Sequence, residues 1–171
     1  MPYEKKLVIR VVLALLILFS YKLFYSILIP ITLYTSFYLL KMLNYGVNLQ
    51  ETAIVTDSHI LTFIPACTAL SAYILLGLLI LLTKGIKLKT GFKMLLLGSL
   101  MIFTANIIRI DSLIIVLING GKNYFETLHL FIWKILSSIF VAFVWIFLIK
   151  RYKIKSVPII SDIKYLRKTV H

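Results

Sequence analysis

The sequence has little cysteine: Cys67 is the single one. One cysteine excludes a disulfide framework within the chain and a CxxC redox pair. No cluster of cysteine and histidine has the spacing of zinc ligands. We therefore expect no structural metal and no cofactor.

Polar surface is also scarce, since 61% of the residues are hydrophobic and the apolar residues come in long runs. Such a chain has too few polar side chains to coat a soluble globule, which indicates an integral membrane protein. The basic start resembles a signal peptide, but the apolar stretch that follows is too long and no small-residue cleavage site follows it. We interpret this stretch as a retained transmembrane helix.

Uncharged runs flanked by lysines predict four membrane spans of about the length needed to cross the hydrocarbon core. They cover about Leu7–Ile29, Ala66–Thr83, Met94–Ile118 and Thr127–Ile149. The apolar segment Ile31–Leu43 follows a predicted helix stop at Pro30 and either continues the first span past a kink or lies in the interface, which we favour. The expected fold is all-α: a helical membrane bundle with about four main transmembrane helices and this additional interfacial helix. Residues 1–149 form a single membrane-embedded domain, and 150–171 form a basic tail.

Basic residues predict the orientation, because they precede the first span, fill the loop after the second and follow the fourth. The positive-inside rule then places both termini in the cytoplasm and puts segments 30–65 and 119–124 outside. The segment 47–65 partly alternates apolar and polar residues around a turn-prone "TDSH", which is typical of a short hairpin. The net charge of +13 is thus a topology signal, and no aromatic-interleaved basic patch points to nucleic acid.

Three polar residues on three predicted spans lie at similar depth. With a rise of about 1.5 Å per residue, Cys67 and Arg109 lie about 24–26 Å and His129 about 31 Å above the inner lysines, in the outer third of the membrane. A guanidinium within a span is costly unless it faces protein, water or a partner, so Arg109 is expected to face the bundle interior. The simpler alternatives are an arginine that snorkels or pairs with Asp111, an interfacial histidine and a buried cysteine that packs as a small hydrophobe.

Together these residues fit a specific chemistry. Pro65 favours the first helical turn, so Cys67 is expected near a helix N-terminus, where amides and the helix dipole stabilise a thiolate. His129 is suited to proton transfer, and Arg109 to holding a carbonyl oxygen or oxyanion. This is the outline of a cysteine acyltransferase or protease.

The motifs "ACTAL" around Cys67 and "NIIRI" with Arg109, followed by His129, resemble those of the exosortase/archaeosortase family in type and order. The resemblance implies that Cys67 is the nucleophile, Arg109 the oxyanion or substrate stabiliser and His129 the acid/base, with Asn106 and Thr68 as supporting residues. The family cysteine is commonly followed by a small residue and then glycine, whereas this chain has Thr68 and Ala69.

The implied activity is that of a membrane cysteine transpeptidase with its active site near the extracytoplasmic face of the cell membrane. Its expected partners are membrane lipids, a lipid or other surface acceptor, and membrane-anchored protein substrates whose C-termini carry a short motif, a transmembrane helix and a basic tail. Two alternatives remain open: an intramembrane cysteine protease that releases its product to water, and a non-enzymatic bundle such as an assembly subunit or small transporter.

Overall fold

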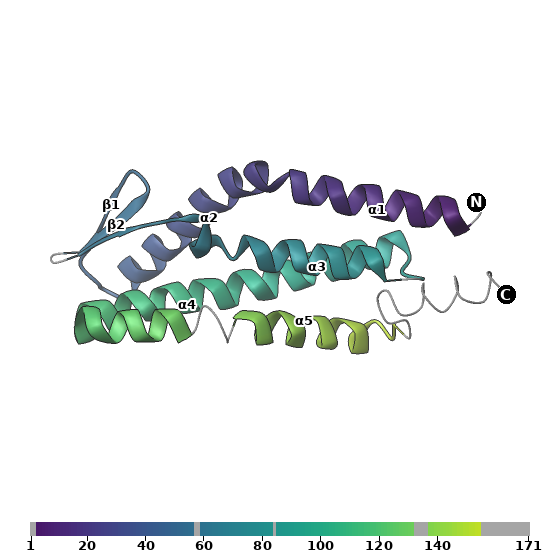
Figure 1. Cartoon of the computed structure of the whole chain (residues 1–171). Helices are drawn as coiled ribbons and strands as arrows, with labels where there is room; N and C mark the ends of the chain where they lie inside the picture. Colours follow the sequence, from purple (N-terminus) through teal and green to yellow (C-terminus); the bar gives the residue numbers. More distant parts are fainter. Residues whose placement is uncertain (1–2, 57–58, 84, 132–136, 155–171) are drawn as a thin grey trace.

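The structure, a computed structural model, describes residues 3–56, 59–83, 85–131 and 137–154, with no account of the side chains of residues 3–7, 120–131 or 137–138. Its helices lie roughly along one long axis, and a small sheet lies at one end, as Figure 1 shows. We call this the sheet end. The opposite end, which holds the start of α1 and the end of α5, is called the basic end.

Two helices, α1 (Tyr3–Phe19) and α2 (Tyr21–Met42), occupy the region where one span and an interfacial helix were predicted. They meet at Ser20, whose hydroxyl donates to Leu16 O at 2.8 Å, a bond that bends helices by competing with the backbone ladder. The predicted stop at Pro30 is wrong, because α2 continues through it and includes residues 31–42. In lipid a proline is tolerated within a helix when neighbouring groups satisfy the freed carbonyl.

A three-stranded antiparallel sheet follows α2; it confirms the predicted hairpin and adds a small β element to a fold that is mostly helical, as predicted. Its strands are β1 (Val47–Gln50), β2 (Ala53–Thr56) and β3 (Ile60–Thr62), in the order β1-β2-β3. Val47 pairs with Thr56, and Ala53 pairs with both Gln50 and Thr62. Ile54 of β2 is fully buried in the same apolar cluster as Leu33 and Leu40 of α2, which anchors the sheet to the helices.

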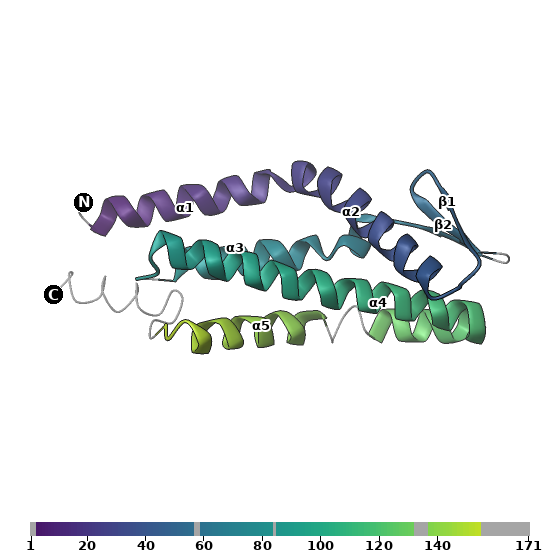
Figure 2. The same ribbon diagram turned by 180° about the vertical axis from the view of Figure 1, so that it is seen from behind.

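The remaining elements are the short 3-10 helix η1 (Pro65–Thr68), α3 (Leu70–Leu82), α4 (Leu88–Phe131) and α5 (Ser137–Arg151). Residues 119–124, predicted as an outer loop, are part of α4. The turn in chain direction still occurs, because Figures 1 and 2 show the light-green final part of α4 running back toward α5. Both described chain ends therefore lie at the basic end.

Two described helices are long and apolar enough to cross a membrane: α2 and the Leu88–Asn119 part of α4. The apolar helices Val8–Phe19 and Leu70–Leu82 are shorter. The predicted second span is thus divided into η1 and a 13-residue α3, and the predicted fourth span into the end of α4, residues outside the described part, and α5.

The apolar interior forms two clusters, one for each end. Leu33, Leu40, Ile54, Phe63 and Ile114 belong to the cluster at the sheet end, against which Cys67 packs. Leu76, Met94 and Leu148 join α3, α4 and α5 in the cluster nearer the basic end. Gly98 of α4 permits this close approach, since a Cβ there would lie 2.6 Å from Leu76 Cδ2.

Candidate active site

Cys67 lies in η1, at the junction between the sheet and α3. The turn closes through its own backbone, where Cys67 N–H donates to Ile64 O at 2.9 Å and the Thr68 hydroxyl donates to Pro65 O at 2.8 Å. Thr68 is fully buried, so this candidate supporting residue stabilises the turn from within. Pro65 opens η1, as a residue without a donor N–H suits the first position of a helix.

Ala69 separates η1 from α3 and adopts the left-handed conformation, with φ 51° and ψ 29°. The α-helix therefore begins at Leu70, so Cys67 lies in the 3-10 turn just before it, near a helix N-terminus as the sequence predicted. The same angles give a physical reason for the glycine that we note as common at this position in the family. A left-handed residue without a Cβ avoids a steric cost of about 1–2 kcal/mol.

Two side chains of α4 hold η1 in place. Asn106 Nδ2 donates to Cys67 O at 2.7 Å, and Arg109 Nη2 donates to Ala66 O at 3.2 Å. The two residues lie about one helical turn apart, so they present adjacent positions on one face. The structure thus brings together Cys67, Thr68, Asn106 and Arg109, four of the five site residues predicted from the sequence.

Asn106 has a different contact from the one expected. The sequence suggested that it would orient Arg109, whereas its amide bonds the carbonyl of Cys67 itself. It is buried, with 4% of its surface exposed, and no described residue bonds its Oδ1. A buried amide that joins the cysteine backbone fixes the turn from which the thiol projects.

The thiol is half-buried in η1, outside both helices that are long enough to span the membrane. Burial raises the pKa of the Cys67 thiol, while a backbone hydrogen bond with Ile64 and the charge of Arg109 act to lower it. Burial is the largest of the three effects. The resting thiol is therefore protonated at neutral pH, and nucleophilic attack requires a base.

His129 lies on α4, in the part whose side chains the structure does not describe. Its proximity to Cys67 and its role as acid/base therefore stay predictions. Among the described residues, no group of three or more histidine, cysteine or acidic side chains is placed to hold a metal ion.

A second buried polar pair was not singled out from the sequence. Ser36 of α2 and Asp111 of α4 lie beside each other and are 0% and 4% exposed. Neither Asp111 oxygen has a hydrogen-bond partner in the described part, so the alternative Arg109–Asp111 pair is not formed. The available signal was an aspartate in a mostly apolar helix and a serine in a stretch that also contains Thr32 and Thr35.

Comparison with known protein families decides the relationship. The family model of the transmembrane exosortase matches residues 5–152. This chain belongs to the transmembrane exosortase family. The family assignment agrees with the apolar helices and with a general role as a membrane cysteine protease or transpeptidase.

The exosortase match extends from α1 to just past the end of α5 and includes every candidate site residue. No curated protein and no solved structure matches the chain.

Proposed function

We propose that this exosortase is a transpeptidase that cleaves the C-terminal sorting signals of exported surface proteins and transfers the new C-terminus to a lipid or other surface acceptor. The observation that supports it best is the arrangement around Cys67. A lone thiol projects from a turn whose two adjacent carbonyls are bonded by Asn106 and Arg109. Preorganised groups of this kind keep a nucleophile and a cation in fixed relation.

In the first step, the thiol proton passes to the imidazole of His129 as the sulfur attacks the carbonyl carbon of the scissile peptide. Arg109 then stabilises the oxyanion of the tetrahedral intermediate. A guanidinium carries five N–H donors, so its bond to Ala66 O is compatible with donation to a substrate oxygen.

The C–N bond then breaks, the leaving amine takes the proton from His129, and a thioester remains on Cys67. An acceptor nucleophile attacks the thioester and gives its proton to His129, which returns it to the sulfur as the new bond to the acceptor forms. Water in place of the acceptor would give a plain carboxylate. A half-buried thiol favours transfer, since it limits the access of water.

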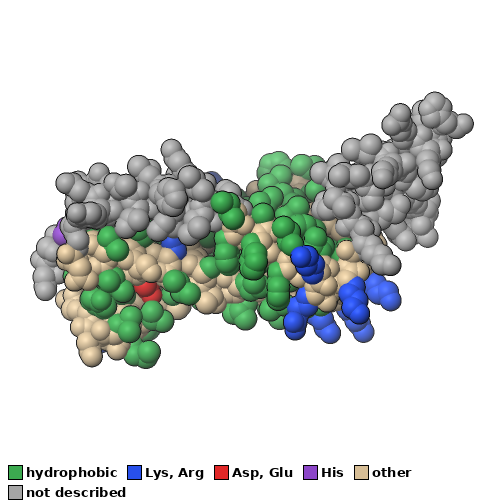
Figure 3. Space-filling model, turned by 90° about the horizontal axis from the view of Figure 1, so that it is seen from below, with side chains coloured by type: hydrophobic (Ala, Val, Ile, Leu, Met, Phe, Trp, Pro, Cys, Tyr) green, Lys and Arg blue, Asp and Glu red, His purple; other side chains and the backbone are tan. Residues whose placement is uncertain are grey.

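In this proposal the sheet end lies on the extracytoplasmic side, because lysines and arginines gather at the opposite end and the positive-inside rule places such residues in the cytoplasm. Figure 3 shows these basic side chains together at the basic end. A membrane-impermeant maleimide is a clean test, because Cys67 is the single thiol. Intact cells should be labelled, and labelling that requires opening of the cytoplasmic face would reverse the orientation.

The reaction itself is tested by mass spectrometry of the mature C-terminus of a co-expressed surface protein that carries a sorting motif, a transmembrane helix and a basic tail. We expect a product with added mass in the membrane fraction and a covalent adduct on Cys67. A product that ends in an unmodified carboxylate in the medium would support the protease instead. An uncleaved substrate in all conditions would contradict both.

A further inference from the structure

A hollow lies at the basic end of the molecule, away from Cys67. It has a volume of about 760 Å³ and is formed by α1, α3, the α3–α4 loop and the first turns of α4. This volume is within the range of pockets that hold small ligands. The residues that line it include none of the candidate catalytic residues.

The floor of this groove is apolar. Leu13 and Ile17 of α1 and Ile80 and Leu81 of α3 line it, together with Gly77, which has no side chain to fill the space. A Cβ at Gly77 would lie 3.8 Å from Ile17 Cδ1, an ordinary contact, so alanine fits there. Because Gly77 and Ile17 both line the groove, a much larger side chain at this position is expected to take up groove volume. Such a surface fits a hydrocarbon chain.

The rim of the groove is cationic. Arg10, Lys87, Lys89 and Lys93 all line it. No aspartate or glutamate occurs in the sequence between Asp57 and Asp111, so none of the groove's α3 and α4 residues offsets these charges. Lysines that snorkel from helix ends account for charge at a membrane surface, but they do not account for a recessed apolar floor beneath it.

We propose that the groove binds an anionic phospholipid, with an acyl chain on the apolar floor and the phosphate near Arg10, Lys87 and Lys93. The two halves of the groove match the two halves of such a lipid in polarity and charge. The basic tail of a sorting-signal helix would instead be repelled by the same rim. The site is separate from the proposed catalysis and does not depend on it.

The test uses the full chain purified in a neutral detergent and titrated with dioleoylphosphatidylglycerol, with dioleoylphosphatidylcholine as the uncharged control, and bound lipid is counted by native mass spectrometry. We expect the protein to retain phosphatidylglycerol at concentrations where it no longer retains phosphatidylcholine. Free glycerol phosphate should not displace it, because the acyl chain contributes through burial. Equal retention of the two lipids would overturn the proposal.

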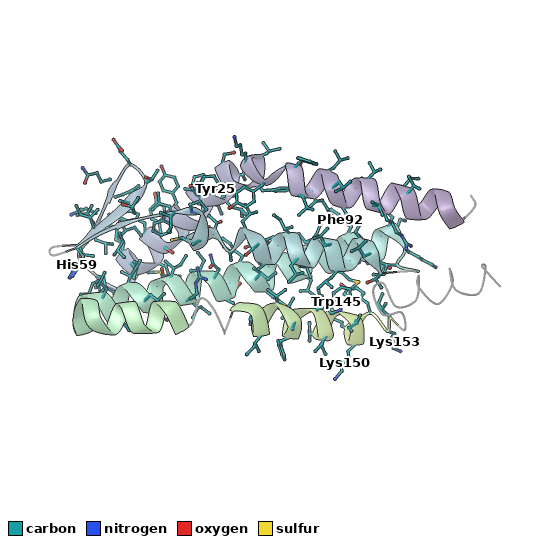
Figure 4. All side chains as sticks on the ribbon, viewed as in Figure 1. Tyr25, His59, Phe92, Trp145, Lys150 and Lys153 are labelled. Atoms are coloured by element: carbon teal, nitrogen blue, oxygen red, sulfur yellow. The ribbon has the colours of Figure 1, made fainter. Side chains whose placement is uncertain are left out.

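Two pairs of lysines give a matched control. Lys87→Gln with Lys93→Gln removes two charges from the rim, and Lys150→Gln with Lys153→Gln removes two charges from the same end outside the groove. Figure 4 shows Phe92, a lining residue, on the side toward α1, and Lys150 and Lys153 on the α5 side. We expect about tenfold weaker binding in the first variant and little change in the second. Equal losses would show a diffuse surface charge effect and overturn the site.

The floor is tested by Gly77→Phe, which fills the hollow, against Gly77→Ala, which does not. Phosphatidylglycerol binding should fall in the first variant and persist in the second. Unchanged binding in a folded Gly77→Phe protein would contradict the groove as the site, and the lysine pairs decide the question if that variant does not fold. A second outcome would also overturn the proposal: displacement of the lipid by a transmembrane peptide that carries a basic tail and is added in the same neutral detergent. That result would show that the groove holds a protein helix.

Discussion

The sheet end and the basic end of this molecule bury different kinds of side chain. Thr32, Ser36, Thr68, Asn106 and Asp111 are all buried in the sheet-end half, whereas Thr83 is the buried polar residue described at the basic end. The charged residues of the basic end are mostly exposed. Because buried polar groups are costly in a membrane protein, their concentration at one end agrees with the active site proposed there.

The largest expected difference between the ends concerns the thiol. Cys67→Ala should reduce substrate processing at least about 10³-fold, because the nucleophile is lost with little change in volume. Thr83→Ala, which removes a buried hydroxyl that donates to Leu79 O at 2.6 Å, should leave processing unchanged. The measurement is the rate of substrate cleavage in membranes with matched enzyme levels. Normal cleavage by the Cys67→Ala variant would show that the difference between the two ends is unrelated to catalysis by this thiol.

The next effect separates positioning from packing on α4. Asn106→Ala removes the bond to Cys67 O, and we expect a loss in cleavage rate of about 10- to 100-fold through a displaced turn. Thr104→Ala is the control on the same helix, since its exposed hydroxyl bonds only Leu100 O at 3.0 Å within that helix. Slower alkylation of Cys67 in the first variant alone would confirm a local cause. An equal loss of activity in both would indicate a general perturbation of α4.

A smaller effect is expected in the titration of Cys67. The Arg109 charge lowers the pKa of the thiol, so Arg109→Gln raises that pKa and moves the pH profile of maleimide alkylation to higher pH. At a fixed neutral pH the thiolate fraction, and with it the alkylation rate, should fall. Arg109→Lys retains the charge and should shift the profile less. An unchanged pH profile in Arg109→Gln would show that the charge of Arg109 does not affect the pKa of the Cys67 thiol.

The smallest expected effects are on stability and have opposite signs at the two ends. Ala69→Gly relieves a left-handed residue at the sheet end and should stabilise the fold by about 0.5–1 kcal/mol. Gly98→Ala places a Cβ within 3 Å of Leu76 and Leu148 and should destabilise it by about 1–3 kcal/mol. Thermal unfolding in detergent measures both. A destabilised Ala69→Gly would mean that the methyl group packs favourably enough to offset the strain.

The apolar composition was sufficient to predict the membrane class, and short motifs were sufficient to select Cys67, Asn106 and Arg109. The helix boundaries were harder to predict. A proline usually ends a helix in water, but Pro30 is tolerated within α2, and the bend lies instead at Ser20, which no sequence pattern indicated. The partner of Asn106 depends on the rotation of α4 against η1, which no local pattern specifies. For the same reason the Ser36–Asp111 contact, which joins two helices, could not be predicted.

The bonds from Asn106 and Arg109 to η1 cross 39 and 43 positions of the chain. During synthesis at roughly 5–20 residues per second, Cys67 therefore precedes these two side chains by about 2–9 s. In that interval the thiol has neither the arginine charge nor the amide that holds its turn. The insertion of α4 thus acts as the assembly step of the proposed site, and a ribosome-bound chain that stops before α4 carries a cysteine without Asn106 and Arg109 beside it.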